Sequence, residues 1–351
     1  MTQLDEILRP PSGTFRTIFL YVGQGEATLM IVPEGEKNHK YILIDSNCGD
    51  GDGLVDVAKL LKGRMPENEL IFINTHHHND HISGIEEINK AVKIKEIWHT
   101  DFKPSSEHDD AYQELKAIVE KIGEENVFYL RGTNEVNILS SDGTEASKVE
   151  HKIGDVDYQV FSPSTYIFDE IDDEKPKDRD KRIHEQCGVI KFSYGEKSIL
   201  LTGDSDKKAW QDHITDYYKD SIKSDVLSAS HHGSRSFFKE GEEDEDIYEE
   251  HIEAIAPEYL VISAPRQSES QHDHPHDDAL EIYEKHISKE NIFHLGENRE
   301  CVVADIDSSG NLKVDTLKMN RQEKPKNDDK SKEVIYETKP PKSKIYCSSC
   351  K

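Results

Sequence analysis

Cysteine, tryptophan and long apolar segments are scarce in this sequence. Five cysteines and two tryptophans occur among 351 residues, and 34% of the residues are apolar. Cysteines that are few, odd in number and scattered are typical of a reducing compartment. No segment approaches the roughly 20 apolar residues that a membrane-spanning helix needs, and residues 1–11 lack the apolar centre of a signal peptide. We therefore expect a cytoplasmic protein that does not associate with membranes.

Positive charge is also scarce. The chain has 44 basic and 71 acidic residues, which gives a formal net charge of −27. Such a surface repels polyanions, and this excludes avid, sequence-independent binding to nucleic acid unless a basic patch or bound cations reverse the local potential. The charge suits single strands, short oligonucleotides or nucleotides better than long duplexes.

The segment 319–351 differs in composition from the rest of the chain. It is rich in Lys, Asp and Pro and poor in apolar residues, so we expect a disordered charged tail after one folded domain at 1–318. Its pair Cys347 and Cys350 lacks the two further ligands that a structural zinc site needs. Two short apolar patches, 334–336 and 345–346, are candidate docking sites for a protein partner.

Strand-like and helix-like patterns alternate along the remainder. Short apolar runs bounded by turn residues predict strands, and apolar spacings of three and four predict helices. The predicted strands are 15–20, 27–32, 40–44, 70–74, 94–99, 127–130, 158–161, 189–192, 198–201, 225–230 and 259–263, and the predicted helices are 54–61, 82–91, 109–122, 207–218 and 279–286. Hairpins interleaved with helices favour the α/β class, as an αββα sandwich of two mixed sheets flanked by helices. Two acidic segments, 169–182 and 239–250, are typical of solvated surface loops.

A histidine cluster directly follows the apolar strand predicted at 70–74. It reads Thr75-His76-His77-His78-Asn79-Asp80-His81. Imidazole and carboxylate ligands suit zinc and related ions. The order divides into two sites, with His76 and His78 on one metal and Asp80 and His81 on a neighbour. The alternative is a surface loop with incidental metal affinity.

Further polar side chains end other predicted strands. Asp204 follows the strand 198–201, where its carboxylate can bridge two cations or cap the next helix. Asp45 ends the strand 40–44, where a carboxylate commonly forms a turn. Because strand residues alternate in direction, only one of His231 and His232 faces the cleft; we favour His231 as the ligand.

These motifs, in this order, resemble the metallo-β-lactamase superfamily. Within it they are most similar to the soluble hydrolase domain of ComEC-type competence proteins and their stand-alone relatives. The resemblance covers 14–317. Besides H-x-H-x-D-H it rests on VGQGEA at 22–27, LID at 43–45, LLTGD at 200–204, HHGS at 231–234 and HPH at 274–276. Departures are Tyr21 and Glu26, where the family usually has Asp, and Ser46, where Gly is common.

The resemblance implies two divalent metal ions, zinc or manganese. The implied ligands are His76, His78, Asp80, His81, His184, Asp204 and His231, with Asp80 and Asp204 as the catalytic carboxylates and Asp204 as the bridge. The residues implied to orient ligands or contact substrate are Asp45, His232, Ser234, His274 and His276. His184 stands where ComEC-like proteins usually carry Asn, so a simple loop histidine is the alternative there. We expect Cys187 to be a packed small residue rather than a nucleophile.

The implied activity is a metal-dependent phosphodiesterase or nuclease that acts on nucleic acid or nucleotides. Two close cations make a water between them acidic enough to attack, and they stabilise charge that develops on substrate oxygens. Two alternatives stay open. One is hydrolysis of an amide, ester or thioester, and the other is a metal-stabilised binding module without catalysis.

Overall fold

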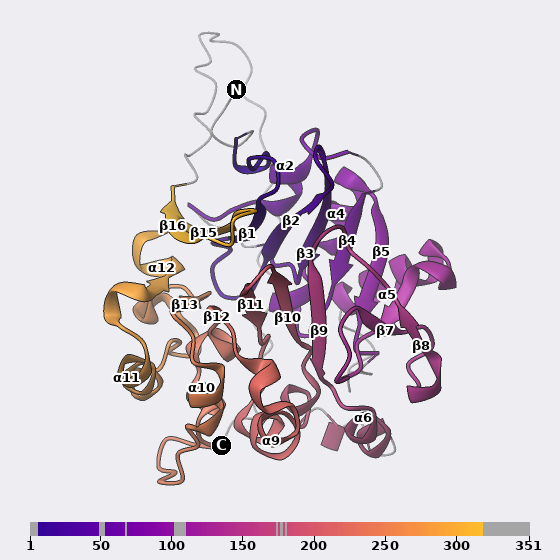
Figure 1. Ribbon diagram of the computed structural model, residues 1–351. Coiled ribbons are helices and arrows are strands. Elements are labelled where there is room, and N and C mark those ends of the chain that lie inside the picture. Colours follow the sequence, from indigo (N-terminus) through magenta and orange to yellow (C-terminus); the bar gives the residue numbers. More distant parts are fainter. Residues whose placement is uncertain are drawn as a thin grey trace, which may run out of the picture. The chain divides into compact units, whose positions relative to one another are not determined.

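The strands of the computed structural model form two sheets (Figure 1). The model describes residues 6–48, 53–66, 69–101, 110–172, 175, 178–179 and 181–318. The first sheet contains, in spatial order, β16 (Leu312–Leu317), β15 (Cys301–Ile306), β1 (Phe15–Phe19), β2 (Thr28–Glu34), β3 (Asn38–Ile44), β4 (Leu70–Ile73), β5 (Ile94–His99), β6 (Val127–Tyr129), β7 (Ile138–Ser140) and β8 (Lys148–Glu150). The second contains β14 (Ile292–His294), β13 (Tyr259–Ile262), β12 (Val226–Ser228), β11 (Lys197–Leu201), β10 (Val189–Tyr194) and β9 (Asp157–Ser162).

Both sheets are mixed. Strands β3 to β6 run parallel to one another, as do β11 to β14, and the other neighbouring pairs are antiparallel. The parallel strand β4, with the sequence LIFI, is buried along its whole length, as expected for a strand covered on both faces. Figure 1 shows β15 and β16, from the end of the described chain, beside β1 from its beginning.

The two sheets pack face to face around the largest of the three hydrophobic cores in the described part of the chain. Residues of both sheets share this core; the rings of Trp98 on β5 and Tyr158 on β9, for example, have centroids 4.8 Å apart. The second core lies between the six-stranded sheet and its helices, and it includes Trp210, Phe237 and Tyr283. The predicted αββα sandwich is therefore confirmed.

Helices cover the outer face of each sheet; in Figure 1, α4 and α5 lie beside β4 and β5, and α2 packs against α4. The helices are α2 (Val57–Leu61), α3 (Asn79–Ile82), α4 (Ile85–Val92), α5 (Asp110–Ile122), α6 (Thr165–Asp172), α8 (Lys207–Ala209), α9 (Thr215–Tyr218), α10 (Glu250–Ile255), α11 (Asp277–His286) and α12 (Leu295–Asn298). Helix α4 buries Ile85, Ile88 and Val92, the spacing of an amphipathic helix. In the described part of the chain, no helix has the length and apolar character needed to span a membrane.

Two predicted helices are interrupted. The helix expected at 82–91 is divided into α3 and α4, because Gly84 adopts a left-handed conformation with φ 77°. The helix expected at 207–218 contains a π-helical segment, η4 (Trp210–Ile214), between α8 and α9. The tail predicted at 319–351 lies outside the described residues.

The acidic segment at 239–250 is exposed or partly exposed, as expected, except at its first residue. The side chain of Lys239 is 9% exposed and lies 2.8 Å from the carboxylate of Asp278. This ion pair holds the beginning of the segment against α11.

Candidate metal centre

Loops that follow strands of both sheets meet at one edge of the sandwich. Asp45 follows β3, the histidine cluster follows β4, Asp204 follows β11 and the histidine pair 231–232 follows β12. The carboxyl ends of parallel strands are the usual ligand-binding edge of α/β proteins.

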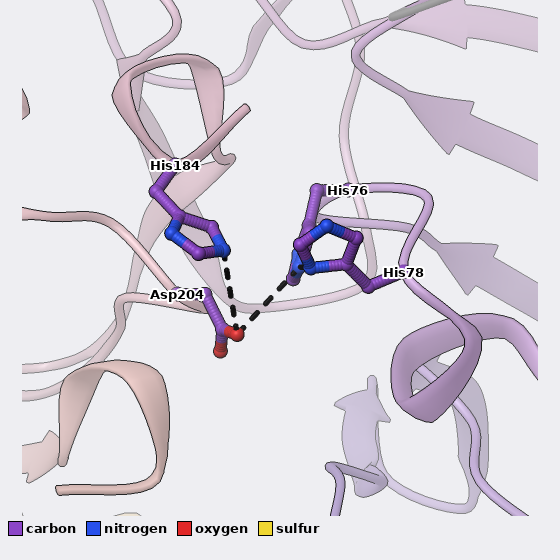
Figure 2. Close-up of side chains that lie close together, drawn as sticks. All are labelled: His76, His78, His184 and Asp204. Carbon is purple, nitrogen blue, oxygen red and sulfur yellow. Dashed lines mark hydrogen bonds and ion pairs between the residues drawn. The ribbon is translucent and has the colours of Figure 1, made fainter. Parts of the chain in front are cut away.

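A first group of four side chains comes from the loops after β4 and β11 and from the short turn that precedes β10 (Figure 2). His76, His78, His184 and Asp204 each offer one ligand atom, and all four atoms lie within 4.8 Å of one another. Asp204 Oδ2 lies 3.6 Å from His76 Nε2 and 4.0 Å from His184 Nε2. Three imidazole nitrogens and a carboxylate oxygen suit a zinc-like cation.

A second group lies on the other side of Asp204. Asp80, His81 and His232 each offer one ligand atom within the same distance limit. His232 Nε2 lies 3.3 Å from His81 Nε2 and 3.4 Å from Asp80 Oδ2. Asp204 Oδ1 lies 3.2 Å from His81 Nε2 and 3.6 Å from His232 Nε2. The carboxylate of Asp204 therefore presents one oxygen to each group.

The side chains at this edge fit a pair of divalent cations. In the part of the chain that is described, the buried atoms Asp204 Oδ1 and His184 Nε2 have no hydrogen-bond partner. A buried polar atom without a partner costs about 1–3 kcal/mol, and a cation would satisfy both atoms. All the ligand atoms are nitrogen or oxygen, which suits zinc and manganese. Such ions, when bound, activate water and stabilise negative charge on substrate oxygens.

Asp45 holds His81 in place from behind. Its carboxylate lies 2.8 Å from His81 Nδ1 and accepts hydrogen bonds from the backbone N–H and the hydroxyl of Thr75 and from Asn74 Nδ2. A partner at Nδ1 leaves Nε2 available for a metal and fixes the ring's orientation.

The geometry favours His232 over His231 as a ligand, the reverse of the preference from strand alternation. Strand β12 ends at Ser228, and both histidines have left-handed backbones with φ of 49° and 58°. The alternation of an extended strand does not apply to such residues. His232 Nδ1 lies 2.8 Å from the carbonyl oxygen of Ser263, to which it donates, so Nε2 is free for a metal.

His231 lies beside the first group without belonging to it. Its Nε2 is 3.5 Å from Asp204 Oδ2, and its Nδ1 is 2.9 Å from the hydroxyl of Ser236. The side chain is 21% exposed, whereas His232 is buried. His231 therefore lies where a substrate can contact it.

Cys187 and Gly203 pack under the first group. The Cys187 thiol is buried, accepts the Asp204 N–H at 3.1 Å and lies 3.5 Å from His76 Nδ1. Burial and the charge of Asp204 raise the pKa of this thiol, so it stays protonated. Gly203 has φ 47°, and a Cβ there would lie 2.5 Å from the thiol sulfur. This close approach explains the glycine of the Thr-Gly-Asp motif.

His274 and His276 extend the row of imidazole rings away from Asp204. The His274 ring centroid lies 5.1 Å from that of His231 and 4.8 Å from that of His276. Burial, with the nearby charges of His232 and His276, lowers the pKa of His274 to about 3, so the ring is neutral at neutral pH. Ser234 does not join this row. Its hydroxyl accepts the Ser236 N–H at the start of the turn Arg235–Phe237.

The sequence did not predict that Glu26 lies among the potential metal ligands. This buried side chain forms a group of potential ligands with Asp45 and His81. Burial and the charge of Asp45 raise the pKa of Glu26 to about 7. The signal in the sequence was its place in a motif where the family usually has another acid.

A model of the metallo-beta-lactamase superfamily matches residues 23–236. The match spans more than half of the chain, and this protein belongs to that superfamily. Membership and the His/Asp groups together indicate a metal-dependent hydrolase. A search of curated proteins gave no match.

Solved structures with the same fold are distant in sequence. The metallo-beta-lactamase fold protein YhfI from Bacillus subtilis is 13% identical, with 86% of this chain and 100% of that chain covered and a TM-score of 0.44. Igni18, a metallo hydrolase from Ignicoccus hospitalis, is 12% identical, with coverage of 86% and 100% and a TM-score of 0.44. Zn(2+)-bound PqqB from Methylobacterium extorquens is 9% identical, with coverage of 80% and 97% and a TM-score of 0.42. Similarity at this level carries no argument about substrate or metal.

Proposed function

We propose that this protein is a two-metal phosphodiesterase that acts on nucleic acid or nucleotide substrates. The observation that carries the proposal is the row of three imidazoles at His231, His274 and His276, beside the bridging carboxylate but outside both ligand groups. Hydrolysis of an amide or ester needs stabilisation at one carbonyl oxygen. A phosphodiester presents two non-bridging oxygens in addition to its leaving oxygen, and so it uses more donors.

The hydrogen bonds of His276 support this role. The backbone N–H of Arg235 donates to His276 Nδ1 at 3.1 Å. The proton of the neutral ring is therefore on Nε2, which makes Nε2 a hydrogen-bond donor. A neutral donor binds phosphate oxygens without adding to the positive charge of two bound cations.

The net charge of −27 limits the substrate. A strongly acidic surface repels a long polyanion everywhere except at a cleft that holds cations. We therefore propose nucleotides, short oligonucleotides or single strands rather than long duplexes.

Three further proposals rest on the sequence. The ordered motifs favour kinship with the ComEC-type hydrolase domain. The scattered cysteines favour a cytoplasmic location. The apolar patches in 319–351 are proposed to bind a protein partner.

The test is turnover of bis-p-nitrophenyl phosphate, nitrocefin and a thioester panel by protein with added zinc or manganese and by chelated protein. We expect metal-dependent turnover of the phosphodiester. His274→Ala should raise KM about tenfold without changing metal content, because one hydrogen bond to a charged group contributes about 1.5–3 kcal/mol. His286→Ala, at the far end of α11, is the matched control and should leave KM unchanged. Turnover of nitrocefin or thioesters alone would favour the second enzyme class, and no turnover with full metal occupancy would favour a binding module.

A further inference from the structure

Glu185 directly follows His184 and is held by several side chains at once. Its carboxylate is 1% exposed. Arg182 donates to it through Nε at 2.7 Å and Nη2 at 2.8 Å. Lys208 Nζ and His213 Nε2 each lie 3.1 Å from Oε1. A carboxylate this deeply buried needs such partners to offset the cost of removing its charge from water, and loss of the carboxylate would leave three basic side chains without it.

The three partners come from separate parts of the chain. Arg182 precedes the short turn η3 (His184–Gln186), Lys208 lies on α8 and His213 lies on η4. Helix α8 begins at Lys207, three residues after Asp204. The carboxylate of Glu185 therefore connects the turn that carries one ligand to the helix that follows another.

The ring of His184 is held by fewer hydrogen bonds than the rings of the other ligand histidines. The rings of His76, His81 and His232 each have Nδ1 in contact with a hydrogen-bonding atom, from Thr75, Asp45 and Ser263 respectively. The Nε2 atom of His184 is buried and has no hydrogen-bond partner among the residues that the structure describes, and the ring packs against other imidazoles, with its centroid 4.3 Å from that of His231. No hydrogen bond at Nε2 fixes the ring, so its position depends largely on the backbone of η3.

We infer that Glu185 is a positioning residue that sets the distance between His184 and Asp204 and so preforms the first metal group. Loss of its carboxylate frees η3 from α8 and lets His184 move away from the other three ligands. Lys208 and Arg182 would also lose their shared partner. The inference concerns the metal site alone and does not depend on the substrate proposed above.

The test is competitive metal titration of chelated protein, with zinc followed by a chromophoric chelator. Glu185→Ala should bind the first-group ion about 10–100-fold more weakly, the usual effect of removing a partner that orients a metal ligand. The second-group ion should keep its affinity. Glu185→Gln, which keeps the shape of the side chain but not its charge, should bind the first-group ion with an affinity between those of the wild type and Glu185→Ala.

Glu170→Gln is the matched control. Glu170 is an exposed acid on α6 that also accepts a hydrogen bond from Arg182, at 3.1 Å, and its loss should change neither affinity by more than about twofold. Melting of the metal-free proteins shows whether each variant is folded. If Glu185→Ala does not fold, Glu185→Gln and Lys208→Met decide the question. Two ions bound with wild-type affinity in a folded Glu185 variant and in Lys208→Met would overturn the inference.

Discussion

At the residue scale, the chemistry of the site converges on the carboxylate of Asp204. Its two oxygens face different ligand groups, at 3.6 Å from His76 Nε2 and 3.2 Å from His81 Nε2. Burial opposes the charge of this carboxylate, but the neighbouring imidazoles outweigh burial and hold its pKa well below the usual range. A permanently ionised carboxylate between two cations reduces their mutual repulsion.

The adjacent histidines 231 and 232 give the first prediction. His232→Ala should lose one of two metal ions, because His232 belongs to the second group. His231→Ala should keep both ions and lose turnover, because His231 contacts Asp204 without completing either group. Elemental analysis after dialysis, together with phosphodiester turnover, separates the two variants. The opposite pattern, with His231→Ala losing an ion and His232→Ala keeping both, would restore the preference from strand alternation.

At the element scale, helix α10 places a buried histidine in the second core. His251 on α10 is completely buried in the second core, with its ring centroid 4.0 Å from that of Phe237. Burial lowers the pKa of His251 to about 3, whereas an unfolded chain has a histidine pKa of about 6.5. As the pH falls, His251 therefore becomes protonated in the unfolded chain before it does in the folded protein. The contribution of neutral His251 to stability is present above pH ~6.5 and is lost as the pH falls toward about 3.

The prediction is a difference between wild type and His251→Leu. Between about pH 7 and pH 5 the free energy of unfolding of the wild type should fall by about 2 kcal/mol more than that of the variant. Urea unfolding of the chelated proteins at the two pH values measures this, and chelation removes the separate effect of metal loss in acid. Equal losses in the two proteins would show that His251 is not what makes the second core sensitive to acid.

Elements with strong apolar patterns could be predicted from the sequence. Strand β4 is a continuous apolar run, and β1, β3 and β5 were also found with small boundary errors. Strand β16 was missed because three of its six residues are exposed and the other three are only partly buried, and such an edge strand has little apolar signal.

The candidate site was predictable where one loop carries several ligands, as in the cluster 76–81. The site residues were less predictable where their contacts depend on local backbone geometry. The left-handed turn at 231–232 reversed the expected order of the two histidines. The contacts of Glu185 join residues from three segments, and no periodic pattern encodes them.

At the scale of the whole molecule, the last strand that the structure describes is β16, which pairs with β15 along its length. The low apolar content of 319–351 offers little burial to offset the entropy of ordering it.

Removal of 319–351 should therefore leave the melting temperature within about 2 °C of the full-length value and leave basal hydrolysis unchanged, since a 1 kcal/mol effect shifts melting by roughly 2–4 °C in larger domains. A longer truncation that ends at Gly310 removes β16 and exposes the β15 edge. It should lower the melting temperature by many degrees. Loss of stability or turnover in the shorter truncation would place part of the tail in the folded domain.

The number of divalent ions bound per chain is the sharpest test of a two-metal centre, because the two ligand groups together offer sites for two ions. Elemental analysis of full-length protein purified without chelator, and again after incubation with zinc or manganese, should give two ions per chain. Asp204→Asn should lose at least one, since each of its oxygens faces a separate group, whereas Asp244→Asn in the acidic segment should keep both. Wild-type protein that holds no ion and takes up none, or an Asp204→Asn variant that keeps two ions with unchanged affinity, would contradict the account.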